Sequence, residues 1–409
     1  MLTSEVNRDA FFIDSLDKSN WKSYRFDEIA KNISERVDPN NTDLEVYVGL
    51  EHLDSNTIHI KRHGTPNDVN GQKLKFYKGD IIFGRRRAYL RKAGVAETDG
   101  FCSAHALVLR ANPEIILPEL FPFFMHSNSF MHKAIDISVG SLSPTINWGT
   151  LKLQEFLLPP KDIQVKLVTL FECLDSVRCG ENKISELLKT YSIVKSKQLL
   201  LGEEYGAKIK HKNMQPIPSL WEVKPLHELF DKLSLRNKRN VSCNVLTISA
   251  KDGLVNQEEY FNKSVASKDL SNYFLLNEGD FAYNKSYSDG YPAGAIKRLK
   301  NYKQGVVSPL YICLKSKCSP YLTVFYEYLF ESGFINQQIL AVAKEGARNH
   351  GLLNVAIDDF LNIKVPVPDQ ATVLKILNEL KKIDVANEKH KAHLENSQKL
   401  QNSLINKVF

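Results

Sequence analysis

The octapeptide FYKGDIIF, residues 76–83, has a counterpart in LNEGDFAY, residues 276–283, at an offset of 200 residues. Each contains a Gly-Asp pair, typical of a turn, followed by an apolar run typical of a strand. The same offset relates WKSYRFDEI at 21–29 to WEVKPLHEL at 221–229, with the tryptophan and one glutamate in register. Matches in this order predict that the chain contains two copies of one module.

The repeat continues toward the end of each copy. SAHALVL at 103–109 matches SPLYICL at 308–314, and the segment 146–160 matches 353–366, so the offset grows only to about 207. Each copy then closes with prolines, at Pro159-Pro160 and at Pro366-Val367-Pro368. Because proline is tolerated at the start of a helix and not inside it, a helix is free to follow each boundary.

Two long segments follow the prolines, at 161–202 and 369–409, and apolar residues recur in both at spacings of three and four. This pattern predicts amphipathic helices. About 40 helical residues at 1.5 Å each would span about 60 Å, which is long for a globular domain. We therefore expect the two helices to pack on each other as an antiparallel coiled coil.

The remaining segments mix short strand-like runs with turns and helical stretches, which predicts the α+β class. We expect two similar α+β domains at 1–160 and 219–368, separated by the two long antiparallel helices with a pseudo-twofold internal repeat. The segment 203–218 is polar, basic and ends in proline, so we expect a linker there.

The composition is that of a globular protein of two to four domains, with 409 residues, 43% hydrophobic and 25% charged. A net charge of +7 is compatible with a polyanionic partner such as DNA. The six cysteines form no C-x-x-C pair and no histidine pair has metal-ligand spacing, so we expect free buried thiols and no metal site. No signal peptide or 18-residue apolar stretch is found, so we expect a cytoplasmic protein.

Several of these motifs together resemble those of the DNA-specificity (S) subunits of type I restriction-modification systems. They are KGDIIFGR at 78–85 with its copy EGD at 278–280, GSLSPTIN at 140–147, LPP at 158–160, and Gln164. The chain departs from the family where Ile163 and Asp369 replace a glutamate and Val367 replaces the second proline of the pair.

The resemblance implies a non-catalytic subunit that serves in phage defence. Such a subunit reads a bipartite, asymmetric site on double-stranded DNA, one half-site per domain. It would hold two methyltransferase (M) and two restriction/translocase (R) subunits, which would carry the methyl donor, ATP and Mg²⁺. Two alternatives stay open: a specificity subunit of a related bifunctional restriction-methylation system, and a helical assembly scaffold that does not read DNA.

The most basic segment follows the first Gly-Asp strand: RRRAYLRK, residues 85–92, with five positive charges and one aromatic ring. Arginine binds guanine bidentately and phosphate electrostatically, so the segment suits DNA, although a solvated strand edge is the plainer alternative. The matching segment 284–291 is polar and aromatic but less basic, as a different half-site would require. The candidate DNA-binding residues are Arg85, Arg86, Arg87, Tyr89, Arg91, Lys92, Ser141, Ser143, Thr145, Asn147, Lys285, Tyr287, Ser288, Tyr291, Lys344, Arg348 and Asn349.

Motifs for catalysis are missing from the sequence. It contains no [DN]-P-P-[YFW] motif of amino-methyltransferases, no glycine-rich methyl-donor turn and no P-loop. Pro368-Asp369 with Glu379-Leu380-Lys381 formally spells a nuclease signature, but it falls on the second expected helix, where the carboxylates cannot sit on adjacent strands around a metal. We therefore expect no catalytic, cofactor-binding or metal-binding residues in this chain.

Overall fold

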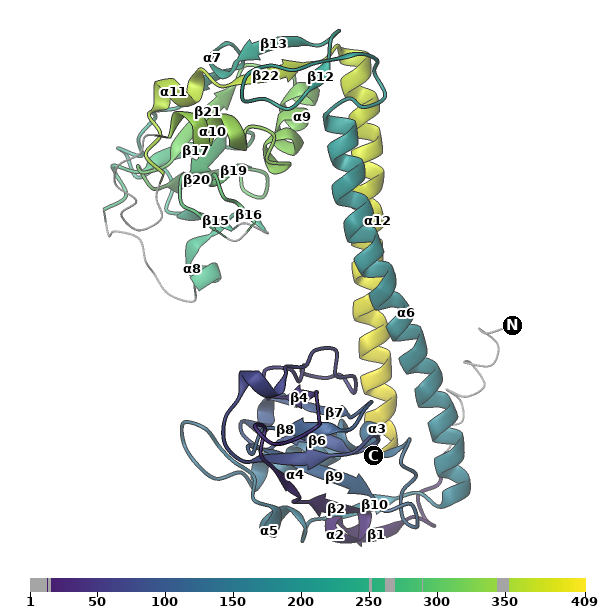
Figure 1. Ribbon diagram of the computed structural model, residues 1–409. Helices are drawn as coiled ribbons and strands as arrows, with labels where there is room; N and C mark the ends of the chain where they lie inside the picture. The colour runs from purple at the N-terminus through teal and green to yellow at the C-terminus, as the bar shows by residue number, and fades with distance from the viewer. Residues whose placement is uncertain (1–12, 14–15, 250–251, 262–268, 289, 344–352) are drawn as a thin grey trace. The chain divides into compact units, whose positions relative to one another are not determined.

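The computed structural model describes residues 13, 16–249, 252–261, 269–288, 290–343 and 353–409 (Figure 1). The chain forms two compact units: unit 1 consists of residues 1–185 and 390–409, and unit 2 of residues 186–389. The sequence-based boundaries at 160, 202, 218 and 368 divide the chain into consecutive parts instead. They differ because the last residues of the chain pack onto the first domain, which no local pattern reveals.

Unit 1 contains most of the first copy. Its strands are β1 (Lys22–Arg25), β2 (Ala30–Ile33), β3 (Arg36–Val37), β4 (Tyr47–Val48), β5 (Lys73–Phe76), β6 (Ile81–Gly84), β7 (Ala93–Val95), β8 (Gly100–Cys102), β9 (Ala106–Ala111) and β10 (Glu155–Leu158). Its helices are α2 (Phe26–Ile29), η1 (Pro66–Asp68), η2 (Ala88–Leu90), α3 (Phe121–Met125), α4 (Asn128–Asp136), α5 (Trp148–Leu151) and the first part of α6 (Lys161–Leu200). The end of α12 (Gln370–Val408) completes the unit.

Unit 2 contains the second copy and the other parts of the two long helices. Its strands are β11 (Lys208–Ile209), β12 (Ile217–Pro218), β13 (Glu222–Pro225), β14 (Phe230–Lys232), β15 (Leu246–Ser249), β16 (Gly253–Asn256), β17 (Phe274–Asn277), β18 (Phe281–Asn284), β19 (Ala295–Arg298), β20 (Gln304–Val307), β21 (Ile312–Ser316) and β22 (Lys364–Val367). Its shorter helices are α7 (Leu226–Leu229), α8 (Gln257–Phe261), α9 (Pro320–Glu331), α10 (Asn336–Val342) and α11 (Ile357–Leu361).

The two units share the topology of their central sheet, which confirms the predicted repeat of two α+β domains. The central sheet has the order β2-β9-β6-β7 in unit 1 and β14-β21-β18-β19 in unit 2. A second antiparallel pair recurs as β1 with β10 and β13 with β22. The Phe26 N–H donates to the Gln154 carbonyl at 2.8 Å, and the Leu226 N–H donates to the Ile363 carbonyl at 2.9 Å. The duplication is therefore visible in individual hydrogen bonds.

The Gly-Asp pair explains why both central strands begin where they do. Gly79 and Gly279 adopt positive φ angles of 90° and 95°, which glycine tolerates because it has no Cβ. The following aspartates are buried, and their carboxylates accept the N–H of the residue three positions earlier, Tyr77 at 2.9 Å and Asn277 at 2.8 Å. These bonds close the turn before β6 and β18.

The core of each unit combines aromatic side chains with residues from both long helices. In unit 1, Phe26, Phe124, Phe130 and Phe156 pack with ring centroids 5.2–5.8 Å apart, and Leu404, Ile405 and Val408 of α12 belong to the same core. In unit 2, Phe230, Phe281, Tyr326 and Phe330 form the matching cluster, joined by Val373 to Ile383 of α12. Each unit thus uses an end of α12 to close its core.

The contacts between the long helices are antiparallel within each unit. In unit 1, Glu181 of α6 pairs with His393 of α12 at 2.8 Å, and the Gln401 side chain of α12 lowers the pKa of Asp175 of α6. In unit 2, the Asn387 amide donates to the Ser192 hydroxyl at 3.1 Å. The less exposed positions of α12 recur at the coiled-coil spacing of three and four, at 383, 387, 390, 394, 397, 401 and 404. Most of them between Asp384 and Lys399 are polar, so the expected coiled coil stays a prediction.

Two further expectations are corrected. The expected linker 203–218 contains the antiparallel pair β11 and β12, and Met214 and Ile217 are buried, because these apolar residues join the core of unit 2. The cysteines are free, but Cys243 is exposed and Cys173, Cys179 and Cys318 are partly buried; the fully buried ones are Cys102 and Cys313. No helix in the described part of the chain is long and apolar enough to span a membrane.

The Gly79→Ala variant should lower the free energy of unfolding by about 1–2 kcal/mol, because the left-handed backbone conformation is unfavourable for a residue with a Cβ. The added Cβ meets no atom within 4 Å, so the cost is conformational alone. Gly149→Ala is the matched control: its Cβ also meets open space, but the backbone is helical and the change should stabilise by up to about 1 kcal/mol. Urea denaturation measures both, and equal effects would contradict this role of Gly79.

Candidate nucleic-acid interface

The basic segment of unit 1 begins where the central strand β6 ends. The Ile146 N–H donates to the Arg85 carbonyl at 2.9 Å, and the Arg87 N–H donates to the Pro144 carbonyl at 2.7 Å. Arg86 and Thr145 form an isolated antiparallel bridge between these bonds. Two groups of candidate residues that are about 60 positions apart in sequence, 85–87 and 141–147, therefore lie side by side.

Arg86 and Arg87 are the most available cations of this surface. Arg87 is exposed and Arg86 partly exposed, and neither guanidinium forms a hydrogen bond or ion pair with any residue that the structure describes. Both line a cavity of about 270 Å³ together with Lys92, Ser143 and one carboxylate, that of Glu51. A cavity lined by unpaired guanidinium groups is suited to an anionic or hydrogen-bond-accepting ligand.

The other candidates in this part of unit 1 lie around the two arginines. Tyr89 is 54% exposed in η2, beside the buried Ala88. Ser141 and Asn147 are exposed, and Thr145 donates its hydroxyl to the Ser143 carbonyl at 3.0 Å. Arg85 is partly buried, and its Nε has no hydrogen-bond partner within the described residues.

Arg91 and Lys92 have a structural role inside unit 1. The Arg91 guanidinium donates to the Asn128 side chain at 2.8 Å and to the His126 carbonyl at 2.6 Å, and burial lowers its pKa. Lys92 donates to the Leu50 carbonyl at 2.7 Å. Both side chains hold the segment 85–92 against neighbouring loops, so we withdraw Arg91 from the set of DNA-reading candidates.

Unit 2 has the same backbone arrangement with different side chains. The Leu353 N–H donates to the Lys285 carbonyl at 3.0 Å, which reproduces the bond between Ile146 and Arg85. Tyr287 occupies the position of Arg87 at an offset of 200 and is 66% exposed. Where unit 1 presents arginines, unit 2 presents lysine, serine and tyrosine.

The remaining candidates of unit 2 have mixed outcomes. Ser288 and Tyr291 form an isolated bridge, and the Tyr291 hydroxyl donates to Glu331 and accepts from Lys297 at 3.0 Å. Burial and the Glu331 carboxylate raise the pKa of Tyr291, and its hydroxyl is already engaged by Glu331 and Lys297 at a partly exposed position. Lys344, Arg348 and Asn349 lie outside the described residues.

His105 lies near the arginines and was missed in the sequence. It is exposed just before β9, and burial together with the charges of Arg86 and Arg85 lowers its pKa. The segment 103–109 is part of the internal repeat, but a single histidine in a turn does not by itself indicate a DNA contact. Its proximity to the arginines depends on the pairing of β6 with β9.

Residues 18–189 match the type I restriction modification DNA specificity domain. This part of the chain, less than half of its length, is similar to that family. The EcoDI specificity subunit of Escherichia coli is 29% identical over 158 residues, which are 38% of this chain and 35% of the relative. The HindI specificity subunit of Haemophilus influenzae is 26% identical over 163 residues, 38% of this chain and 36% of the relative. These alignments span about a third of the curated relatives' length.

Solved structures resemble the chain over nearly its whole length. One is a chain of a structure that describes complex assembly and conformational transition of the type I R-M system. It has a TM-score of 0.58 at 15% identity, and the match covers 95% of this chain and 97% of that one. The type I restriction-modification S subunit from M. genitalium has a TM-score of 0.50 at 13% identity, covering 97% and 98%. The specificity-domain family and the fold of a type I specificity subunit thus agree with the resemblance read from the motifs.

The hydrogen bonds of Arg91 within unit 1 should contribute to the stability of the folded chain. Arg91→Ala should lower the free energy of unfolding by about 2–3 kcal/mol, because it removes two charged hydrogen bonds and leaves their acceptors in a partly buried site. Arg87→Ala, four positions earlier and exposed, should change it by less than about 0.5 kcal/mol. Urea denaturation of both variants measures this difference, and a neutral Arg91→Ala would return Arg91 to the candidate interface.

The histidine beneath Arg91 makes unit 1 sensitive to acid. Burial lowers the pKa of His126 to about 4, although its Nε2 donates to the Ala93 carbonyl at 2.8 Å. Between the ordinary pKa of about 6.5 and pH 4, the unfolded chain therefore binds a proton that the folded chain does not. This histidine makes stability fall as the pH is lowered through that range, by at most about 1.4 kcal/mol per pH unit.

The test compares urea denaturation at pH 7, 6 and 5 for the wild type, His126→Gln and His132→Gln. Glutamine preserves a donor to Ala93 but does not titrate, so His126→Gln should show a shallower loss of stability on acidification. His132 is exposed on α4, the helix that begins two residues after His126, and its variant should behave as the wild type. Identical pH dependence in all three proteins would contradict the assignment.

Proposed function

We propose that this chain is the DNA sequence-specificity subunit of a type I restriction-modification complex. Each unit reads one half of a bipartite, asymmetric site on double-stranded DNA. The chain itself is non-catalytic and works in the cytoplasm. It positions two methyltransferase and two restriction/translocase subunits, which carry the methyl donor, ATP and Mg²⁺.

The observation that carries this proposal is the contrast between two equivalent loops. Both follow the central strand of their unit, and in each the carbonyl of the first residue accepts a hydrogen bond from a backbone N–H, that of Ile146 or Leu353. One loop carries Arg85-Arg86-Arg87 and the other Lys285-Ser286-Tyr287. A conserved backbone with unlike side chains is what two readers of different short sequences need, since base recognition depends on donor and acceptor patterns.

The chemistry of the first loop supports contact with duplex DNA. Arg86 and Arg87 retain all their donors for a ligand, and a guanidinium matches both a phosphate and the O6 and N7 edge of guanine. Ser141 and Asn147 are exposed on the segment that pairs with residues 85–87. A DNA strand lying along the loop would therefore also contact these two side chains. We assign Arg86 and Arg87 to DNA contact, and Ser141, Ser143 and Asn147 to its edge.

The two long helices supply the spacing between half-sites in this proposal. Each has about 40 residues and contributes to the cores of both units. At 1.5 Å per residue such a helix is about 60 Å long, enough to keep two recognition domains on successive turns of DNA roughly 34 Å apart. Helix length would then determine the length of the unread spacer.

Partner docking is supported by apolar residues of α6 that the chain leaves exposed. Leu187, Tyr191 and Val194 in unit 2 follow the helical spacing of four and three, and each is at least half exposed. A row of this kind on a helix favours a protein partner over water. We assign it to the methyltransferase subunits.

The deciding experiment is a modified-base map of the genome, by long-read sequencing, in cells that express this chain with its neighbouring methyltransferase. Matched cells lack this chain. We expect methyladenine at one split, asymmetric motif, and only when the chain is present. An active methyltransferase that assembles with the chain but methylates no chain-dependent motif would overturn the proposal and favour an assembly scaffold.

A single substitution tests the arginine loop. Arg87→Ala should weaken binding of the methyltransferase complex to its site roughly 10-fold and reduce the salt dependence by about one phosphate contact if Arg87 neutralises a phosphate. If it reads a base, discrimination at one position should relax instead. Lys31→Ala is the control, since Lys31 pairs across from Arg110 at the other end of the sheet. Fluorescence anisotropy at several salt concentrations measures both, and equal small effects would contradict the assignment.

A further inference from the structure

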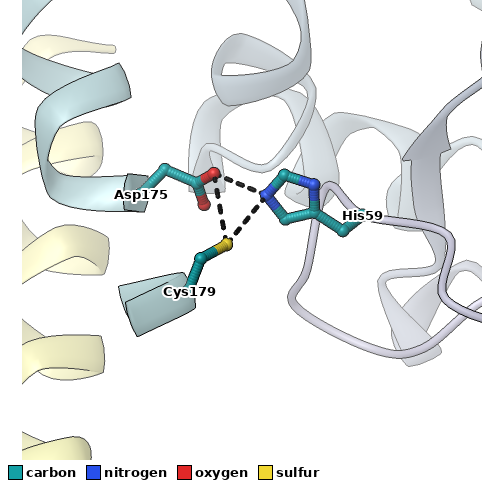
Figure 2. Close-up of side chains that lie close together, drawn as sticks. All are labelled: His59, Asp175 and Cys179. Carbon is teal, nitrogen blue, oxygen red and sulfur yellow. Dashed lines mark hydrogen bonds and ion pairs between the residues drawn. The ribbon is translucent and has the colours of Figure 1, made fainter. Parts of the chain in front are cut away.

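Three side chains of unit 1 with metal-binding atoms converge away from the arginine loop. His59 comes from the segment between β4 and η1, and Asp175 and Cys179 lie one turn apart on α6 (Figure 2). The His59 Nε2 lies 2.5 Å from the Asp175 Oδ2, and the Cys179 Sγ lies 3.4 Å from the same nitrogen and 4.0 Å from the same oxygen. One imidazole, one carboxylate and one thiol thus point at a common centre.

These distances are close to those around a tetrahedral metal ion. Zinc binds nitrogen and oxygen at about 2.0–2.2 Å and sulfur at about 2.3 Å, which separates its ligand atoms by about 3.3–3.8 Å. The two distances to sulfur already fall near this range. The contact between His59 and Asp175 has the length of a hydrogen bond, and an ion bound by both atoms would require it to lengthen by about 1 Å.

The surroundings orient the three groups. Asp175 is 7% exposed; its Oδ1 has no hydrogen-bond partner among the described residues, and the Arg178 guanidinium lies 3.7 Å away from it. The other ring nitrogen of His59, Nδ1, faces the Glu97 carboxylate at 3.9 Å. A carboxylate behind a histidine is the usual outer contact of a metal-binding imidazole, where it fixes the ring and raises its basicity.

Charges of both signs surround the cluster: the carboxylates of Asp175 and Glu97, and the cations Arg178, Lys61 and Lys183. An ion binds the neutral imidazole and the thiolate, so its binding releases the protons that His59 Nε2 and Cys179 Sγ carry without metal.

We propose that His59, Asp175 and Cys179 form a binding site for one zinc ion through Nε2, Oδ2 and Sγ, with water in the fourth position. The donor set selects the metal: thiolate and imidazole favour zinc, whereas Mg²⁺ and Ca²⁺ prefer oxygen ligands throughout. The ion joins the loop before η1 to α6 and so fixes the recognition domain on its long helix. The proposal does not depend on what DNA the chain reads.

The test uses the tag-free, full-length chain, stripped with a chelator and returned to zinc. Competition with a chromogenic zinc chelator should show one tight zinc per chain. His59→Gln and Cys179→Ser should each weaken zinc binding at least about 10-fold. Loss of a residue that only hydrogen-bonds a metal ligand already costs about that much, so loss of a ligand should cost no less. His63→Gln and Cys173→Ser are the matched controls, an exposed histidine in the same loop and a free, partly buried cysteine on the same helix, and both should bind as the wild type.

A second measurement does not depend on variants that could fail to fold. The wild-type chain loaded with Co²⁺ should show a thiolate-to-cobalt charge-transfer band and the visible spectrum of a four-coordinate site. Absence of the band, or zinc uptake no greater than that of the His59→Gln/Cys179→Ser double variant, would overturn the proposal and leave a histidine–aspartate ion pair. Equal zinc loss in the two control variants would overturn it as well.

Discussion

A buried carboxylate at the start of the central strand constrains both units. Asp80 and Asp280 are 1% and 6% exposed, and each accepts a backbone N–H from the residue three positions earlier. An unpaired carboxylate at such depth would be strongly unfavourable, so the turn has little freedom to move. The strand that follows is short, and its far end delivers Arg85 in one unit and Lys285 in the other. The turn before the strand is the same in both units, whereas the side chains of the loop after the strand differ.

The two copies satisfy the same constraint by different means. In unit 1 the Asp80 carboxylate is held by Arg110, with Nε 2.7 Å from Oδ1 and a terminal nitrogen 2.9 Å from Oδ2. In unit 2 no ion pair with Asp280 appears within the described residues, and burial raises the pKa of Asp280 despite the bond from Asn277. Backbone geometry has therefore been retained while side-chain partners have diverged.

A similar divergence is found where each long helix begins. The buried Gln164 donates to the Ile115 and Pro159 carbonyls and accepts from the Leu117 N–H, which ties α6 to the domain. Gln370 in the second copy is exposed, and Asp369 instead caps α12 by accepting from Thr372. The departures from the family motif at this point thus correspond to a different helix start.

Local patterns in the sequence predicted the turns, the repeat offset and the long helices, because glycine conformation, proline boundaries and apolar spacing act over a few residues. They did not predict that residues 390–409 complete unit 1 or that Arg91 binds Asn128, since both depend on contacts between distant segments. Asp175 and Cys179 are four residues apart on one helix, but His59 is more than a hundred residues away in the sequence. The expectation that the chain lacks a metal site rested on sequence spacing alone. Spacing does not reveal a cluster whose residues come from distant segments.

The central claim is that each unit reads its own half of one DNA site. Its most direct test replaces residues 1–160 with the corresponding segment of a specificity subunit of different specificity, joined at Pro160 just before α6 begins, and maps methyladenine in cells with the same methyltransferase. The account predicts that one half of the motif changes while the other half and the spacer length stay the same. A change in both halves, or in neither, with methylation still active, would contradict it.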